Sequence, residues 1–461
     1  MKHNRKYYLI IPLLFCISIQ FSLIVRSVAT EQIEVSTKKA SDFVNSIGVE
    51  VRLYPEQRSS LWTEILKPRL QELGVRHIRT NISAAGVSID SNSRGKIVAD
   101  RIQELGNLNR PIKTTGILRE FGNWISKMRA IQYLENSLEA IEGPNEPNRR
   151  GEGFDYIDQE GIRHGNYDVY GSGNKIKVGR GWIHGVRLFM EDLHFYVKKY
   201  SNLDIISFSP TKGGYDKVNQ YQKDNNWHLE DWIDYGNLHL YRQSEPERGI
   251  PLKKARATMY PTKPIVVTET GYSTSKQHWP YVPNEEIQAT YNLRSLLELF
   301  NLGVKRTYIF SLLRFKQGRY FSLLDPDDLD NPVYEPKMSF NAVRDTISLL
   351  EENRSDFIPK RLDYQIINKP YKRNQNNYHS LVLQKSDNKF YIILWLAVPY
   401  DASNLERTFD FQLKTPGFIK ANFYQPIQNG TKIVKEIFDL YHVQQLTISD
   451  KPLIIELIPQ F

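Results

Sequence analysis

The feature that most constrains the fold is a regular alternation of apolar runs and amphipathic segments between residues 47 and 350. The apolar runs have the length of strands, and most segments after them place apolar side chains at helical spacing. We predict eight strands, at residues 47–53, 75–82, 111–118, 138–141, 203–209, 237–241, 264–269 and 303–310. Such alternation is typical of a parallel sheet, and eight units favour a closed (β/α)8 TIM barrel.

Helices are predicted in most of the segments between these strands. They cover residues 60–73, 97–108, 124–134, 180–200, 252–259, 283–302 and 337–350. Residues 210–227 and 321–336 are expected to be loops, and the Gly-rich stretch at 151–175 is expected to shape a substrate cleft. An open doubly wound sheet shares this alternation, but the chain has no G-x-G-x-x-G or G-x-x-x-x-G-K motif. We therefore favour the barrel and expect no nucleotide cofactor.

The pattern changes at about residue 356. Short apolar runs, separated by turn residues and without long helical patterns, follow at 381–383, 390–396, 408–411, 421–424 and 453–457. They predict a small antiparallel β-sandwich. The expected domains are thus a barrel at residues 30–355 and a sandwich at 356–461, after an N-terminal segment at 1–29. The sandwich is expected either to bind carbohydrate or to support the barrel.

The N-terminal segment predicts export. A basic stretch at residues 2–6 precedes a nearly apolar run at 7–25, and a Ser-Val-Ala stretch at 27–29 provides small side chains for cleavage. A secretory signal peptide is the first interpretation, and an uncleaved membrane anchor is the alternative. Cys16, within this run, is the only cysteine, so the folded part has no disulfide, cysteine nucleophile or zinc–thiolate site.

The overall charge and the aromatic content say less about function. The formal net charge is +9, but charges of both signs are interspersed along the chain. We treat this basic balance as a weak sign of a polyanionic partner and expect no nucleic acid. Aromatic residues make up 12% of the chain, which suits surfaces that stack on sugars but also suits large cores.

Two glutamates follow predicted strands. Glu146 lies in an Asn-Glu-Pro run after residues 138–141, and Glu269 ends the run at 264–269. Side chains at the carboxyl ends of barrel strands line the active site. Glycoside hydrolysis needs two carboxyl groups, because one protonates the leaving oxygen and the other supports or attacks the oxocarbenium-like centre. The alternative for the first motif is a helix-opening Asn-Glu-Pro without chemistry.

This arrangement resembles the clan A glycoside hydrolases over about residues 47–350. In that clan the acid/base glutamate lies at the end of barrel strand four, and the nucleophile lies at the end of strand seven. The resemblance implies that Glu146 is the acid/base, that Glu269 is the nucleophile and that Asn145 hydrogen-bonds the sugar 2-hydroxyl. It assigns a clan but no family, and it implies neither a metal ion nor an organic cofactor.

Further residues are candidates for binding the substrate. His239 and Tyr241 lie two residues apart on one face of a predicted strand, and the resemblance implies that Tyr241 hydrogen-bonds Glu269 and keeps it ionised. The alternative for His239 is a core histidine. Trp279 is either a sugar-stacking platform or a packed loop residue. Phe310 stands where many clan members have Trp, so the floor of the −1 sugar subsite departs from the clan.

Four arginines lie near predicted strand ends, namely Arg52, Arg79, Arg242 and Arg314. If they converged on the cleft they would favour an anionic sugar, such as a uronic acid or a sulfated unit, because guanidinium groups bind carboxylates in a bidentate manner. Ion pairs within the protein are the alternative.

The expected function is retaining hydrolysis of O-glycosidic bonds in a poly- or oligosaccharide by an exported enzyme. Two alternatives remain open. One is a non-catalytic carbohydrate-binding or surface protein that has kept the barrel, and the other is a transglycosidase that remodels an exopolysaccharide. The sugar, the linkage and endo or exo cleavage depend on loops, which these patterns do not specify.

Overall fold

The computed structural model describes most of the chain between residues 31 and 460. The described residues are 31–53, 60–82, 94–119, 123–149, 155–157, 163–165, 181–211, 214–241, 250–275, 284–313, 320–326, 334–367, 378–399 and 406–460. The expected signal peptide or anchor at residues 1–29 lies outside this part of the chain. Within it, no helix combines the length and the apolar character needed to cross a membrane.

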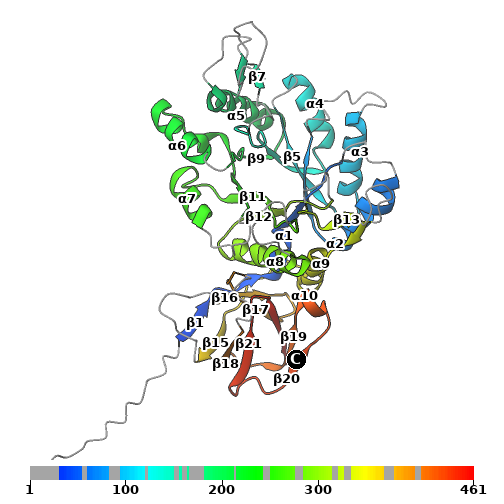
Figure 1. The fold of residues 1–461 in the computed structure, drawn as a ribbon, viewed down its shortest axis with the longest axis vertical. Coiled ribbons are helices and arrows are strands. Elements are labelled where there is room, and N and C mark those ends of the chain that lie inside the picture. The colour runs from blue at the N-terminus through cyan, green and yellow to red at the C-terminus, as the bar shows by residue number, and fades with distance from the viewer. Residues whose placement is uncertain are drawn as a thin grey trace, which may run out of the picture.

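Eight parallel strands form the predicted barrel (Figure 1). In sheet order they are β10 (Gly236–Leu240), β11 (Ile265–Thr270), β12 (Arg306–Ile309), β3 (Ile47–Glu50), β4 (His77–Asn81), β5 (Lys113–Ile117), β6 (Leu138–Glu142) and β9 (Asp204–Ile206). A parallel bridge between Ile206 and Tyr235 joins β9 to the start of β10. Because this bridge closes the ring of strands, the prediction of a TIM barrel is confirmed.

Helices surround the strands (Figure 1). They are α1 (Ala40–Asn45), α2 (Lys67–Leu73), α3 (Arg94–Gly106), α4 (Trp124–Leu134), α5 (Gly181–Tyr200), α6 (Gly214–Asn225), α7 (Ile250–Thr258), α8 (Glu285–Asn301) and α9 (Met338–Leu350), with a π-helical stretch at Leu61–Leu66 and a 3-10 turn at Leu229–Trp232. Helix α2 ends where Gly74 adopts a left-handed φ of 78°. Helix α8 begins where the Asn284 side chain accepts a hydrogen bond from the Ile287 N–H at 2.9 Å.

Two segments that the sequence predicted to be loops contain regular structure, so those predictions are wrong. Residues 210–227 include α6, which buries Val218 but is otherwise so polar that it shows little apolar periodicity. Residues 321–336 include the paired strands β13 (Leu324–Pro326) and β14 (Tyr334–Pro336), which are too short for an alternation signal. Within the excursion at 151–175, β7 (Asp155–Ile157) pairs with β8 (Arg163–Gly165), and the remainder lies outside the described residues.

Packed side chains fill the barrel interior. Ala140, Ile206, Val266 and Tyr308, each from a different strand, form one buried cluster. The Tyr308 ring fits because its neighbour is Gly48, where a Cβ atom would lie 2.4 Å from the ring. Since the interior is a core rather than a channel, a substrate has access only to the ends of the strands.

Two sheets form the predicted sandwich. One has the order β2 (Lys38–Lys39), β16 (Tyr378–Gln384), β17 (Phe390–Leu396), β22 (Leu453–Pro459), β19 (Phe418–Tyr424) and β20 (Lys435–Ile437), and the other has the order β1 (Glu31–Val35), β15 (Leu362–Ile367), β18 (Arg407–Leu413) and β21 (Gln444–Ile448). All pairs are antiparallel except β2 with β16, and a short helix, α10 (Pro426–Asn429), follows β19. Strands β1 and β2 precede the barrel in the chain, so the sandwich includes residues 31–39, which the predicted boundaries gave to the barrel domain.

Helices α8 and α9 lie between the barrel and the sandwich (Figure 1). Arg294 is only 2% exposed and donates a hydrogen bond to the Val398 carbonyl oxygen at 3.1 Å. Nearby, Nδ1 of His379 lies 2.7 Å from a carboxylate oxygen of Glu298. The sandwich therefore packs on the helical exterior of the barrel.

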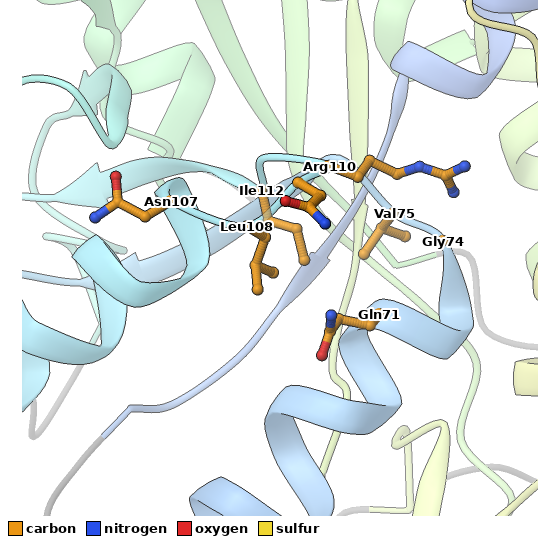
Figure 2. Close-up of a pocket in the computed structure, with 8 residues that line it drawn as sticks. Gln71, Gly74, Val75, Asn107, Leu108, Arg110 and Ile112 are labelled. Atoms are coloured by element: carbon orange, nitrogen blue, oxygen red, sulfur yellow. The ribbon is translucent and has the colours of Figure 1, made fainter.

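A hollow of ≈ 450 Å³ lies on the barrel at the ends of α2 and α3 (Figure 2). Its lining residues are Gln71, Gly74, Val75, Asn107, Leu108, Asn109, Arg110 and Ile112. These segments lead into β4 and β5, so the hollow opens at the amino ends of the strands. It is separate from the carboxyl ends, where the predicted catalytic residues lie.

Candidate active site

The two predicted catalytic glutamates come together at the carboxyl ends of the strands. Glu146 follows β6 and Glu269 belongs to β11, the fourth and seventh strands of the barrel. One carboxylate oxygen of each and one ring nitrogen of His239 all lie within 4.8 Å of one another. The side chains of Glu146 and Glu269 are 12% and 9% exposed, so both carboxyl groups are shielded from bulk water without being sealed from it.

An irregularity in β11 turns Glu269 toward the site. The register between β10 and β11 pairs His239 with Glu269 and skips Thr268. The Thr268 hydroxyl points into the barrel, where it donates to Glu142 at 3.1 Å. In a regular strand the next side chain would then point outward. The bulge thus allows two consecutive side chains to face the barrel axis.

The chain after β6 holds Glu146 in an unusual conformation. Asn145 forms a bridge with Ser209, and the Glu146 N–H donates to the Ser209 carbonyl oxygen at 3.2 Å. Glu146 has a φ of 42°, in the left-handed region that residues with a Cβ atom seldom adopt. Its carboxylate accepts a hydrogen bond from Arg149 Nη1 at 2.9 Å, and His239 Nδ1 lies 3.2 Å from its other oxygen. Such backbone conformations cluster at functional sites.

Arg79, on β4, is the centre of the polar network. Its Nε and Nη2 donate to the two oxygens of Glu142 at 2.6 and 2.8 Å, and its Nη1 donates to both Glu50 and Glu269 at 2.7 Å. Its Nη2 also donates to Asn145 Oδ1 at 2.7 Å. Arg79 is 0% exposed, so it cannot reach an anionic group on a substrate. All five of its hydrogen bonds go to side chains of the protein, so the structure favours the alternative of an internal ion pair over the predicted substrate-binding role.

Tyr241 and His239 complete the surroundings of Glu269. The Tyr241 hydroxyl donates to Glu269 Oε2 at 2.7 Å, and His239 Nδ1 lies 3.5 Å from the same oxygen. Burial raises the pKa of Glu269, but His239, Arg79 and Tyr241 outweigh it and hold that pKa below its usual value. Burial and then the Glu269 charge raise the pKa of Tyr241 well above its usual value, so its hydroxyl stays a donor. Glu269 is therefore an anion at neutral pH.

Three residues of the network were not predicted from the sequence, namely Glu50, Glu142 and Asn237. Glu142 is 0% exposed and accepts a hydrogen bond from Asn237 Nδ2 at 3.0 Å in addition to those from Arg79. Burial and then the charge of Glu269 raise the pKa of Glu50 to about 7. A sequence signal did exist for the two glutamates, because each is a charged residue directly after an apolar one at the carboxyl end of a strand.

The remaining predicted residues divide into two groups. Phe310 is 9% exposed and lies beside Tyr241, with its ring centroid 6.2 Å from those of Tyr241 and Phe321. Arg52 follows β3 and is half-buried, close enough to Glu50 to favour its charged form. Three others lie outside the described residues, namely Trp279, Arg242 and Arg314.

In the described chain, Glu146, His239 and Glu269 form a group that is compact enough to surround a cation. Its electrostatics do not suit one. The Arg79 guanidinium and the Tyr241 hydroxyl each donate to an oxygen of Glu269 at 2.7 Å, so both of its oxygens are already engaged. A metal ion would also lie close to the positive charge of Arg79. The arrangement suits a nucleophile held between donors rather than a metal ligand.

Comparison with known proteins identifies the fold on which this site lies. No protein-family model matches the chain, and no curated protein matches it by sequence. A family 39 glycoside hydrolase from the gut symbiont Bacteroides cellulosilyticus WH2 matches in structure with a TM-score of 0.55 and 14% identity, over 92% of this chain and 83% of that one. A family 51 α-L-arabinofuranosidase from Bifidobacterium longum has a TM-score of 0.56 and 10% identity, over 92% and 97%. The chain has the clan A glycoside hydrolase fold.

A GH30 endoxylanase from Clostridium papyrosolvens C71 also matches this clan A fold, with a TM-score of 0.51 and 9% identity over 94% of this chain and 98% of that one. Each match spans more than nine-tenths of this chain, so the likeness includes the sandwich as well as the barrel. The resemblance to clan A inferred from the sequence is therefore confirmed for the fold.

Proposed function

We propose that this chain is a retaining glycoside hydrolase that cleaves O-glycosidic bonds of a poly- or oligosaccharide by double displacement. The observation that carries the proposal is the short distance between Glu146 and Glu269, whose nearest carboxylate oxygens lie within 4.8 Å. Retaining enzymes hold their two carboxyl groups about 5–5.5 Å apart, whereas inverting enzymes leave about 6.5–9.5 Å for a water molecule. The observed spacing supports the retaining mechanism.

In the first step, Glu269 attacks the anomeric carbon while Glu146 donates its proton to the leaving oxygen. Arg79 and Tyr241 fix the two oxygens of Glu269, each through a hydrogen bond of 2.7 Å. Fixed donors of this kind orient the nucleophile before the reaction, so less reorganisation is needed at the transition state.

In the second step, Glu146 accepts a proton from water, and the resulting hydroxide-like oxygen displaces Glu269 from the sugar. Asn145 has a separate role in both steps. Because its Oδ1 accepts from Arg79, its amide NH2 group remains a donor for the substrate 2-hydroxyl. A hydrogen bond to that hydroxyl strengthens in the transition state.

The proposed substrate is a carbohydrate. None of the described residues requires it to carry a negative charge. Arg79 serves the protein's own carboxylates, and of the four arginines considered only Arg52 is both described and partly exposed. The basic N-terminal stretch and apolar run in the sequence support an exported enzyme acting on an extracellular substrate.

Covalent trapping tests the proposal. The purified full chain would be incubated with a panel of 2-fluoro glycosides that carry good leaving groups, and the peptides would then be mapped by mass spectrometry. We expect a sugar adduct on Glu269 that is absent from Glu269→Gln. The control is Glu456→Gln, which removes a carboxylate of the sandwich held by Tyr391 and Tyr424 and should retain the adduct.

The outcomes separate the candidate functions. An adduct on another carboxylate would overturn the assignment of Glu269. A folded protein that binds glycans tightly but forms no adduct and releases no reducing ends would favour the non-catalytic reading. An adduct that is resolved faster by added sugar than by water would favour transglycosylation.

A further inference from the structure

The carboxylates around Arg79 outnumber the positive charges that pair with them. Glu50, Glu142 and Glu269 all hydrogen-bond this one guanidinium, and Arg79 and Glu142 are 0% exposed. With all three carboxyl groups ionised, these four side chains carry a net charge of −2 in a buried site, and a protonated His239 beside Glu269 lowers it only to −1. Excess buried charge is costly, and a proton on one carboxyl group removes most of that cost.

The hydrogen bonds indicate which carboxyl group takes that proton. The Glu142 carboxylate accepts three, two from Arg79 and one from Asn237, and lies 3.1 Å from the Thr268 hydroxyl, which also donates to Asn237 Oδ1. Glu269 accepts from Arg79 and Tyr241 and has His239 beside it. In the described part of the chain, the Glu50 carboxylate accepts only the bond from Arg79 Nη1. Glu50 is therefore the least stabilised of the three as an anion.

The charged and titratable groups around Glu50 come from each neighbouring strand. They are Arg52 on its own segment, Arg79 on β4, His239 and Tyr241 at the end of β10, and Glu269 on β11. Burial raises the pKa of Glu50, Glu269 adds to the rise, and Arg79, Arg52 and His239 lower it, with about 7 as the result. Glu50 is 7% exposed, so its carboxyl group can exchange a proton with solvent.

We propose that Glu50 is a positioning residue that carries a proton while Glu269 is an anion and releases it while Glu269 is a glycosyl ester. The geometry that supports this is the shared Arg79 Nη1, which lies 2.7 Å from both carboxylates. Loss of the Glu269 charge removes the repulsion and leaves the Arg79 charge to stabilise the Glu50 anion. The inference rests on the proposed function, because it assigns the ester to Glu269.

The protons and bonds balance over the two steps. In the first, a Glu269 oxygen bonds to the anomeric carbon, the glycosidic bond breaks, the Glu146 proton moves to the leaving oxygen, and the Glu50 proton moves to solvent water. In the second, water attacks the anomeric carbon and gives one proton to Glu146, the ester bond to Glu269 breaks, and Glu50 takes a proton back from solvent. The net charge beside Arg79 is thus the same before and after each step.

Titration of Glu50 in the full chain tests this coupling without requiring activity. The carboxyl infrared band of Glu50 would be identified as the band lost in Glu50→Gln, and its intensity would be followed with pH in the wild type and in Glu269→Gln. The neutral amide in Glu269→Gln stands for the neutral ester. We expect a midpoint near 7 in the wild type. In Glu269→Gln we expect it to be lower by about one unit or more, the size typical of two carboxylates that share a site.

The same titration provides the control and the result that would refute the inference. Glu456→Gln, in the sandwich, should leave the midpoint of Glu50 unchanged, and Glu269→Ala provides a second neutral variant if Glu269→Gln does not fold. An unchanged midpoint in a folded Glu269 variant would refute the inference whatever the activity of the enzyme. A shifted midpoint without any covalent adduct in the trapping experiment would instead overturn the proposed function and leave the coupling of the two carboxyl groups intact.

Discussion

Replacement of Arg79 by Met tests whether one buried cation holds the three neighbouring carboxylates together. Arg79 makes five hydrogen bonds, to Glu50, Glu142, Glu269 and Asn145. Removal of one partner of a buried ion pair costs about 3–5 kcal/mol, because the other charge stays buried without compensation. We expect a loss of that size rather than a multiple of it, since protonation of Glu50 and the remaining donors to the other two carboxylates limit the cost.

The loss should depend on pH, and its sign follows from the carboxyl groups left behind. Without Arg79, burial raises their pKa values above the value of about 4.3 that they have in the unfolded chain. The folded state then binds more protons than the unfolded state, so the stability of Arg79→Met falls as the pH rises. In the wild type the depressed pKa of Glu269 gives a stabilisation that is already complete above the unfolded value, and only Glu50, whose pKa burial raises to about 7, loses stability as the pH rises through this range. The difference between the two proteins should therefore grow from pH 5 to pH 8.

The assay is urea unfolding at several pH values, followed by a probe in the barrel. The control is Arg294→Met, which removes a buried guanidinium whose hydrogen bond goes to a carbonyl oxygen, and its loss of stability should change little with pH. A loss for Arg79→Met that is below about 1 kcal/mol, or that is equal at pH 5 and pH 8, would refute the reasoning, because unpaired buried carboxylates must cost more when ionised.

Three further predictions concern catalysis and packing. Tyr241→Phe removes a hydrogen bond to a charged acceptor, which is worth about 1.5–3 kcal/mol, so we expect kcat to fall about 10- to 150-fold. The pKa of Glu269 should rise, and pH–rate profiles should show the acidic limb of kcat/KM moved to higher pH. Glu146→Gln should lower kcat/KM about 10²- to 10⁴-fold on glycosides with poor leaving groups and far less on activated aryl glycosides, and equal losses on both would contradict an acid role. Gly48→Ala should destabilise the barrel by about 1–3 kcal/mol in urea unfolding, because the new methyl group meets the ring of Tyr308, and an unchanged stability would show that the ring can move aside.

The sequence correctly predicted those strands and helices whose apolar pattern lies within a single segment of the chain. The strand ending at Thr270 was located because the continuous apolar run at 265–267 marks a buried parallel strand, and the strand ending at Glu142 was located from the apolar residues on either side of Glu139. Helix α6 was missed, because most of its side chains face solvent and only Val218 and Gly214 are fully buried. Periodicity reports a buried face, so a helix with a narrow buried face gives a weak signal.

The candidate site was harder to predict, because its properties arise between segments. The proximity of Glu146 to Glu269 followed from the barrel alternation, but the bulge that turns Glu269 inward depends on its register with β10. The burial of Arg79 by three carboxylates involves strands far apart in the sequence. An arginine read alone is equally compatible with a substrate anion and with an internal ion pair, and only the enclosing carboxylates decide between them.

The two strands that precede the barrel have a consequence for the order in which the chain can fold. Strand β1 pairs with β15, and β2 pairs with β16, so the barrel is an insertion within the sandwich rather than a module placed before it. During synthesis, residues 31–39 emerge before the barrel and stay without their partner strands until the last quarter of the chain follows. The barrel, whose eight strands all lie between residues 47 and 309, does not have to wait. Removal of the sandwich at residue 356 would leave β1 and β2 as unpaired edges prone to aggregation, so an isolated barrel should begin near residue 40.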